Sequence, residues 1–381
     1  MSDPLSHELI EGQPAFEALM DAVAGASPVA LDTESASFHR YHDRVYLIQL
    51  TAVGRTAVID PLTVDDLDRL GDMLADRAVE KVFHDADYDL RLLHHEFDFQ
   101  ARGLFDTRIA AQLLGEPGIG LAALLERYLN VKPDKRFQRA DWSSRPLSPA
   151  MLEYAAGDTA HLHELQRILR AKLVETGRLW WAEEEFGLLE SIRWDRGEDD
   201  PRESYLGLKG ARALERRGLA ILRELYAWRE GTAARLDRAS FRVVGNEVLF
   251  HLAEHPVRDR EALGRVRGIG RELVGRWGEE VLAAIEAGLA VPEDELPKFP
   301  RGPRRPPPDP EFDDRLQALK ARRNALAERM GLLPGVLCPN AILEAIARDR
   351  PEPVEAMAGI PGMREWQRKE IGAELLAAVP A

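Results

Sequence analysis

Short apolar runs alternate with amphipathic stretches over the first 130 residues, and this pattern predicts strands interleaved with helices. Runs rich in β-branched and other apolar residues predict strands over residues 28–34, 44–50, 56–60 and 81–84. Apolar positions at helical spacing predict helices over residues 14–24, 64–74, 87–97, 104–114 and 121–129. Three strands in succession, followed by helices alternating with strands, predict an α/β domain with a mixed sheet flanked by helices.

An irregular polar loop over residues 132–146 separates this region from a long predicted helix. Ser148 followed by Pro149 is a typical helix start, because the serine hydroxyl caps the first turn and proline fits there. We predict that this helix runs from residue 149 to about residue 176. Thr63 is predicted to cap the helix over residues 64–74 in the same way.

The back half is helical in pattern and contains an internal repeat. A shift of 94 residues, without a gap, aligns Arg229 with Arg323 and Asn246 with Asn340. An alignment of this kind indicates two copies of one small helical domain. We therefore predict an N-terminal domain (1–200), a helical domain (205–290), a proline-rich and semi-rigid linker (291–310) and a second helical domain (311–381).

Composition narrows the class of protein. The N-terminus lacks the pattern of a signal peptide, and no apolar run is long enough to span a membrane. Cys338 is the only cysteine, which excludes an intrachain disulfide and fits a cytoplasmic protein.

The net charge of −14 is unusual for a nucleic-acid binder. Residues 1–200 hold 21 Lys and Arg against 37 Asp and Glu, so the acidity belongs to the first domain, and phosphate binding requires local basic patches or metal ions.

Two carboxylates close the first predicted buried strand. Asp32 and Glu34 are two residues apart, so their side chains point to the same face of the strand. Such a pair repels itself unless a cation lies between the two groups, and a divalent metal ion is the usual cation. The alternative is a solvated strand end, so the assignment depends on residues further along the chain.

Further acidic residues follow at helix positions. Asp89 lies in the first turn of a predicted helix, and Tyr154 and Asp158 are four residues apart on one face of the long helix. Carboxylates without cysteine are the ligand chemistry of Mg²⁺ or Mn²⁺. Asp89 can instead stabilise its helix, because a negative charge near the N-terminus interacts favourably with the helix dipole. Tyr154 can instead be a core residue. Asp106 is better placed as a helix cap than as a ligand.

Histidines offer a competing metal site. His84, His94, His95, His161 and His163 are the candidates for zinc ligands. Their spacing supplies no third matched ligand, so we expect no zinc site.

The acidic residues stand in motifs. Three stretches resemble the three exonuclease motifs of the DEDD superfamily, in its tyrosine subgroup. They are Asp32-Thr33-Glu34, then Phe83-His84 with Asp89-Leu90, then Tyr154-Ala155-Ala156-Gly157-Asp158. The family resemblance can be narrowed to bacterial ribonuclease D. It is carried by residues 104–107, residues 134–147 and the paired C-terminal repeats. The repeats resemble HRDC domains, and residues 228–229 and 268–270 carry that likeness in the first copy.

This resemblance implies an RNase H-like exonuclease domain followed by two HRDC-type helical bundles. It implies 3′-5′ exoribonuclease action with two divalent metal ions, trimming of tRNA precursors and other RNA 3′ ends, and release of 5′-mononucleotides. Asp32, Glu34, Asp89 and Asp158 would hold the ions, with Tyr154 beside the attacking water. The second repeat departs from the first at residues 322–323 and 359–362, so the resemblance implies RNA binding more directly for the first repeat than for the second.

A basic and aromatic loop precedes the catalytic helix. Bases of single strands stack on aromatic side chains while cations hold the phosphates. The residues that we expect to contact RNA are His84, Lys135, Arg136, Gln138, Arg139 and Trp142. The alternative is a solvated loop with a buried Trp142. The basic run at residues 298–305 is either a second phosphate contact or only a charged linker.

Two other functions remain open at this point. A DNA 3′-5′ exonuclease would use the same carboxylates, although no polymerase or helicase motif accompanies them here. A catalytically inert RNA-binding scaffold would not require the complete acidic set. The sequence indicates no obligate protein partner and does not determine the oligomeric state.

Overall fold

The computed structural model describes residues 6–134, 136–195, 203–300 and 309–379. The chain divides into two compact units, one formed by residues 1–35, 45–194 and 306–381 and the other by residues 36–44 and 195–305. Each unit has a hydrophobic core of its own.

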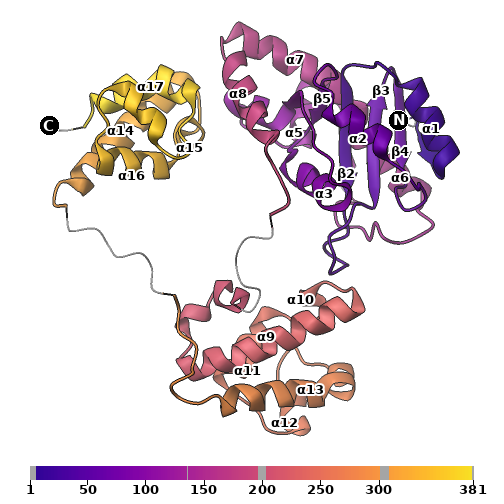
Figure 1. Ribbon diagram of the computed structural model, residues 1–381, viewed down its shortest axis with the longest axis vertical. Helices are drawn as coiled ribbons and strands as arrows, with labels where there is room; N and C mark the ends of the chain where they lie inside the picture. The colour runs from indigo at the N-terminus through magenta and orange to yellow at the C-terminus, as the bar shows by residue number, and fades with distance from the viewer. Residues whose placement is uncertain (1–5, 135, 196–202, 301–308, 380–381) are drawn as a thin grey trace. The chain divides into compact units, whose positions relative to one another are not determined.

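A mixed sheet forms the centre of the first unit, as Figure 1 shows in indigo and violet. Its strands are β1 (Glu8–Ile10), β2 (Val29–Glu34), β3 (Leu47–Ala52), β4 (Arg55–Ile59), β5 (Lys81–Phe83) and β6 (Leu104–Asp106). They lie in the order β1-β4-β3-β2-β5-β6. Strand β2 is internal and pairs antiparallel with β3 and parallel with β5. The predicted mixed sheet is therefore confirmed.

The two edge strands were not predicted. Strand β1 has three residues, and it pairs parallel with β4. Strand β6 also has three residues, where we predicted the start of a helix. Strands this short carry too few alternating positions to be recognised, and only pairing with a neighbour defines them.

Helices cover the sheet. They are α1 (Gln13–Ala22), α2 (Asp68–Ala75), α3 (Asp87–Phe97), α4 (Thr107–Leu113), α5 (Leu121–Leu129), α6 (Pro149–Ala160), α7 (Leu162–Glu175) and α8 (Leu179–Leu189). Helix α6 packs on β2, β3 and β4. Its buried face consists of small residues, Ala155, Ala156 and Thr159, which let the helix lie close to the strands. The Thr159 hydroxyl is hydrogen-bonded to that of Thr51 on β3 at 2.8 Å.

Two predictions about helix ends are corrected. The long helix is two helices, because the chain leaves helical geometry at His161 between α6 and α7. Thr63 does not cap α2, which begins at Asp68 without a side-chain cap. The Thr63 hydroxyl instead donates to the Asp60 carbonyl and accepts from the Gly12 N–H.

A helical bundle at the C-terminus belongs to the same compact unit as the sheet. It contains α14 (Phe312–Met330), α15 (Pro334–Leu337), α16 (Asn340–Asp349) and α17 (Glu365–Leu376). Trp366 of α17 stacks on Trp181 of α8 with ring centroids 4.6 Å apart, and its indole N–H donates to Glu185.

The second unit holds the first helical repeat. Its helices are α9 (Arg216–Leu236), α10 (Ser240–Val243), α11 (Asn246–Glu254), α12 (Arg260–Gly264) and α13 (Arg271–Ala290). Figure 1 shows α9 and α13 as its long helices, and their contacts form much of its core.

Equivalent polar contacts support the internal repeat. Arg229 is buried and donates to the Asn246 side chain at 2.6 Å, and Arg323 is buried and donates to Asn340 at 2.8 Å. Each arginine also donates to a backbone carbonyl two residues before its asparagine. The same shift of 94 residues therefore relates both the sequences and these buried contacts.

Across the described residues, no helix has the length and apolar character that crossing a membrane requires.

Candidate active site

Strand β2 presents the first two carboxylates. Asp32 lies opposite Gln49 of β3, and Glu34 lies opposite Leu47. The side chains of Asp32 and Glu34 share the face on which α6 packs, because Thr51 belongs to the same face and contacts Thr159. Residues 29–31 anchor this strand in the core, so the two carboxylates emerge where the buried part of the strand ends.

Helix α6 brings the third carboxylate to the first two. Ser148 caps the helix by accepting from the Met151 N–H, as predicted. One carboxylate oxygen each from Asp32, Glu34 and Asp158 lie within 4.8 Å of one another. These three side chains are partly exposed, so an ion or a substrate can reach them. Among the described residues, this is the one group of three or more such side chains with metal-binding spacing.

Asp89 is held beside this group by Thr33. The Thr33 N–H donates to Asp89 Oδ1 at 3.1 Å, and the Thr33 hydroxyl donates to the same oxygen. Asp89 is buried in the first turn of α3. Its second oxygen is not used by Thr33, and its charge acts on Asp32, Glu34 and Asp158.

Burial raises the pKa values of all four carboxyl groups, and the charges of their neighbours add to it for Asp32, Glu34 and Asp158. Burial is the larger cause for Asp32 and Glu34, and the neighbouring negative charges add to it. Burial raises the pKa of Asp89 to about 7, against the opposing effect of the Thr33 hydrogen bonds. Burial and the charge of Asp89 raise the pKa of Asp158 to about 7. A site that disfavours its own ionised form in this way favours a bound cation.

Tyr154 lies one helical turn before Asp158 and packs against two aromatic rings. Its ring centroid is 5.9 Å from that of Phe137 and 5.9 Å from that of Trp142. Burial and the charges of Asp158, Glu34 and Asp32 raise the pKa of the phenol far above its ordinary value. Tyr154 therefore keeps its proton beside the carboxylates.

A pocket of about 390 Å³ adjoins this cluster. Tyr154 and Asp158 form part of its wall, together with His84, Gln138 and the first residues of α5. Two of the expected RNA contacts, His84 and Gln138, therefore line a cavity at the candidate active site.

The other expected RNA contacts that the structure describes do not line this pocket. Arg136 is exposed and ion-paired with Asp134 at 2.6 Å, and Arg139 is exposed. Trp142 is 1% exposed, so it cannot stack on a base in this structure; its place against Tyr154 corrects the prediction of a direct RNA contact. Lys135 lies outside the described residues.

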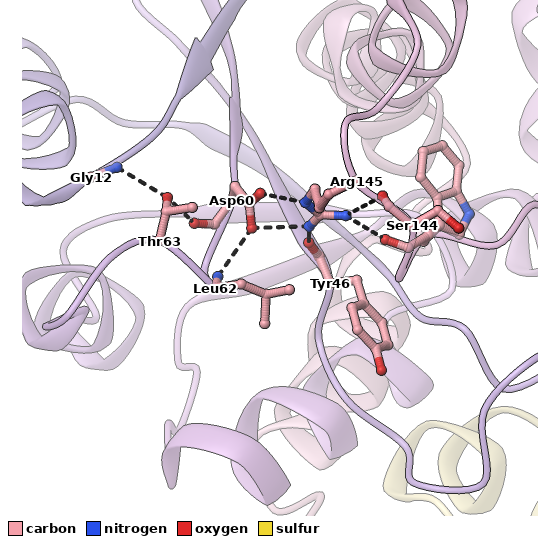
Figure 2. A network of polar contacts seen from close by, with 8 residues as sticks. Gly12, Tyr46, Asp60, Leu62, Thr63, Ser144 and Arg145 are labelled. Atoms are coloured by element: carbon pink, nitrogen blue, oxygen red, sulfur yellow. Dashed lines mark hydrogen bonds and ion pairs between the residues drawn. The ribbon is translucent and has the colours of Figure 1, made fainter. Parts of the chain in front are cut away.

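Arg145 fastens the loop that carries Trp142. Figure 2 shows its guanidinium group between Asp60 and three backbone carbonyls. Arg145 donates to both oxygens of Asp60, at 2.6 and 2.9 Å, and to the carbonyls of Tyr46, Trp142 and Ser144. Asp60 follows β4, and its side chain is 2% exposed. A bidentate ion pair between the partly exposed Arg145 and the buried Asp60 therefore joins the end of β4 to the loop before α6.

Asp106, His94 and His95 have structural roles. Asp106 is buried and caps α4 by accepting from the N–H groups of Arg108 and Ile109, as predicted. His95 stacks on Trp194, and His94 Nδ1 accepts from the backbone N–H of Trp194. Within the described residues the histidines form no metal-binding group.

Sequence reasoning missed Thr33, Asp60 and Arg145 as supports of the site, and it missed Thr107, whose hydroxyl oxygen lies 2.9 Å from His84 Nδ1. Strand alternation indicates that Thr33 faces away from Asp32 and Glu34, but it does not identify Asp89 as the partner. Asp60 and Arg145 are 85 residues apart, and no local pattern connects them.

Comparison with known proteins agrees with this geometry. The profile of the family described as 3′-5′ exonuclease matches residues 7–174, and the HRDC domain profile matches residues 218–285 and 312–379. Ribonuclease D of Granulibacter bethesdensis is 33% identical over 98% of this chain and 92% of its own length. Ribonuclease D of Acidiphilium cryptum is 36% identical over 78% of this chain and 77% of its own length.

A solved structure gives the same result. The crystal structure of Escherichia coli RNase D, described as an exoribonuclease involved in structured RNA processing, matches with a TM-score of 0.71. It is 27% identical in sequence and covers 99% of this chain and 100% of its own. In this chain, β2, α3 and α6 bring carboxylates together at a mixed sheet, and two HRDC domains follow. The relatives named above match over most of their length. This chain belongs to the ribonuclease D family of 3′-5′ exoribonucleases.

Proposed function

We propose that this protein trims RNA 3′ ends, tRNA precursors among them, at the carboxylate cluster, and releases 5′-mononucleotides. In this proposal Asp32, Glu34, Asp89 and Asp158 hold two divalent ions, Mg²⁺ or Mn²⁺. The observation that carries it is the convergence of Asp32, Glu34 and Asp158 within 4.8 Å, with Asp89 held beside them. The compartment that we propose is the cytoplasm, and the domain division is that predicted above (1–200, 205–290 and 311–381).

The residues present fit a pair of hard cations. All ligands offered are carboxylate oxygens, which Mg²⁺ and Mn²⁺ prefer. Burial disfavours the ionised form of these four groups, so positive charge bound beside them would stabilise that form. Two divalent ions bound in such a site supply an activated water and stabilise the attacking and leaving oxygens in phosphodiester hydrolysis.

The protein's own groups then orient the reactants. Tyr154 keeps its phenol proton, because burial and the neighbouring charges raise its pKa. We therefore assign it to hydrogen bonding that positions the attacking water rather than to proton removal. Trp142 and Phe137 pack on its ring and restrict its orientation. Arg136, Gln138 and Arg139 remain proposed RNA contacts, and Trp142 acts through Tyr154.

Laddering of an RNA tests this proposal. A tRNA with a labelled 5′ end and a 3′ extension is incubated with the protein, with and without Mg²⁺. We expect products that shorten by single nucleotides from the 3′ end, only when Mg²⁺ is present. Internal cleavage, or no cleavage with either Mg²⁺ or Mn²⁺, would refute it.

Metal binding should stabilise the protein more at higher pH. The folded pKa values of Asp89 and Asp158, about 7, lie above the unfolded value of 3.8. The metal-free protein therefore loses stability as the pH rises between these two values, since ionised carboxylates are disfavoured only in the folded state. A bound dication offsets this cost, so we expect Mn²⁺ to raise the unfolding temperature more at pH about 8 than at about 5.5.

Thermal unfolding followed by circular dichroism measures this effect. The double variant D32N/D158N should show little or no shift with Mn²⁺ at either pH. An equal shift at both pH values in the native protein, or an undiminished shift in the double variant, contradicts the assignment of the ligands.

The two alternative functions have separate tests. Degradation rates of RNA and DNA oligomers of one sequence distinguish a ribonuclease from a DNA exonuclease. An inert scaffold would bind RNA without carboxylate-dependent Mg²⁺ or Mn²⁺ binding, which a metal titration of the native protein and the double variant detects.

A further inference from the structure

His84 occupies a position between the sheet and the pocket at the active site. It follows directly after β5 and is partly exposed. His84 lines the same pocket as Tyr154 and Asp158, and the volume of this pocket is about 390 Å³. The apolar residues Leu121 and Ala122 of α5 line this pocket as well. A cavity with an apolar wall beside the cluster has the character of a site for a nucleoside.

The hydrogen bonds of Thr107 determine where the His84 ring carries its proton. The Thr107 hydroxyl donates its single hydrogen to the Phe83 carbonyl at 3.0 Å, because a carbonyl oxygen can only accept. His84 Nδ1 lies 2.9 Å from the same hydroxyl oxygen. With its hydrogen already used, the hydroxyl can only accept there, so His84 Nδ1 carries an N–H. Thr107 is fully buried, which makes this arrangement rigid.

The other ring nitrogen therefore has no hydrogen. Burial lowers the pKa of His84 to about 4, so the imidazole is neutral near pH 7. A neutral imidazole protonated at Nδ1 leaves Nε2 as a hydrogen-bond acceptor and nothing else. Within the described part of the chain, no group donates to this nitrogen. A ligand in the pocket that brings a donor to Nε2 would gain a hydrogen bond that the protein does not provide.

An RNA end can bring that donor from its sugar or from its base. An enzyme that removes successive nucleotides meets all four bases at the same position, and their edges present different donors and acceptors. An acceptor that read the base would slow the removal of some nucleotides. The ribose 2′-hydroxyl is present on every RNA nucleotide and absent from DNA.

We propose that His84 Nε2 accepts a hydrogen bond from the 2′-hydroxyl of the 3′-terminal ribose, and that this contact selects RNA over DNA. The inference rests on the proposed active site and adds a specificity-determining residue to it. Thr107 is then a positioning residue, since its buried hydroxyl holds the ring in the acceptor tautomer.

Two variants separate the two ring nitrogens. In His84→Asn the amide nitrogen lies near the place of Nδ1, so the contact with Thr107 can persist without an acceptor at the place of Nε2. In His84→Gln the amide group reaches the place of Nε2 and can accept. The substrates are three RNA oligomers of one sequence that differ only in the terminal sugar, which is ribose, 2′-deoxyribose or 2′-O-methylribose.

Single-turnover rates for removal of the terminal nucleotide give the readout. The native protein should remove the ribonucleotide about tenfold faster than the deoxynucleotide, the value of one neutral hydrogen bond. The 2′-O-methyl end, which has lost its donor, should be removed no faster than the deoxy end. In His84→Asn the ratio of the ribose rate to the deoxy rate should fall to about one, and His84→Gln should keep part of the preference.

The opposite results overturn the inference. They are a native protein indifferent to the terminal sugar, or a His84→Asn variant that slows the ribose and deoxy substrates by the same factor. Failure of the proposed active site gives a different result, because Asp158→Asn would then remain active on every sugar.

Discussion

An Asp158→Asn variant is expected to remove the 3′-terminal nucleotide of RNA about a thousandfold more slowly than the native protein, or more slowly still. Asparagine keeps the shape of the side chain but removes the negative charge that Asp158 adds to the cluster with Asp32 and Glu34. Asp32→Asn should have an effect of the same order. RNA binding should change little in either variant, because asparagine keeps the size of the side chain and the backbone is unaltered. Single-turnover cleavage of a labelled oligomer, beside a binding assay, separates the two quantities.

Glu153→Gln is the matched control for Asp158→Asn. Glu153 lies on the same helix, α6, but is exposed, so the same change of charge should leave the rate nearly unaltered. The metal-free Asp158→Asn protein should unfold at a temperature no lower than that of the native protein, since burial disfavours the ionised carboxylate that it lacks. Retention of the rate within tenfold of native would remove Asp158 from the proposed ligands.

Replacing Arg145 with alanine is expected to cost about 3 kcal/mol or more in the free energy of unfolding. The substitution leaves the carboxylate of Asp60 buried without its bidentate partner, and it also frees the carbonyls of Tyr46, Trp142 and Ser144. The loop before α6 then loses its attachment to the end of β4 (Figure 2). Because Trp142 packs on Tyr154, catalysis should slow as well. Urea unfolding followed by tryptophan fluorescence measures the loss of stability.

Arg136→Ala is the comparison within the same loop. Arg136 also pairs with a carboxylate, that of Asp134, but its side chain is 73% exposed. An exposed ion pair contributes at most about 1 kcal/mol to the free energy of unfolding, so the stability of this variant should be close to that of the native protein. The double variant Asp60→Asn with Arg145→Met should recover part of the stability, because it leaves no buried unpaired charge. If Arg145→Ala is no less stable than Arg136→Ala, the loop does not depend on the ion pair.

The sequence alone was sufficient for those features that short stretches of chain encode. Helix α3 begins and ends where its apolar spacing predicts, Ser148 and Asp106 cap their helices, and β2 ends in the carboxylate pair. Capping and periodicity act over three or four residues, so the local sequence determines them. The motifs also indicated the family, because they combine residue types whose chemistry only a few functions require.

Tertiary structure decided what depends on residues far apart in the chain. Pairing with neighbours makes strands of residues 8–10 and 104–106, which are too short to show a period. Packing against Tyr154 places Trp142 in the interior, although its loop is otherwise polar and basic.

The supports of the site show the same distinction. Thr33 contacts Asp89 across 56 residues, and Asp60 contacts Arg145 across 85. Nothing in either local sequence specifies these partners, because the path of the chain through the sheet brings them together. The residues that we propose for the chemistry were therefore identified from the sequence, whereas the contacts that hold them in place, and the tautomer that we infer for His84 from Thr107, required the fold.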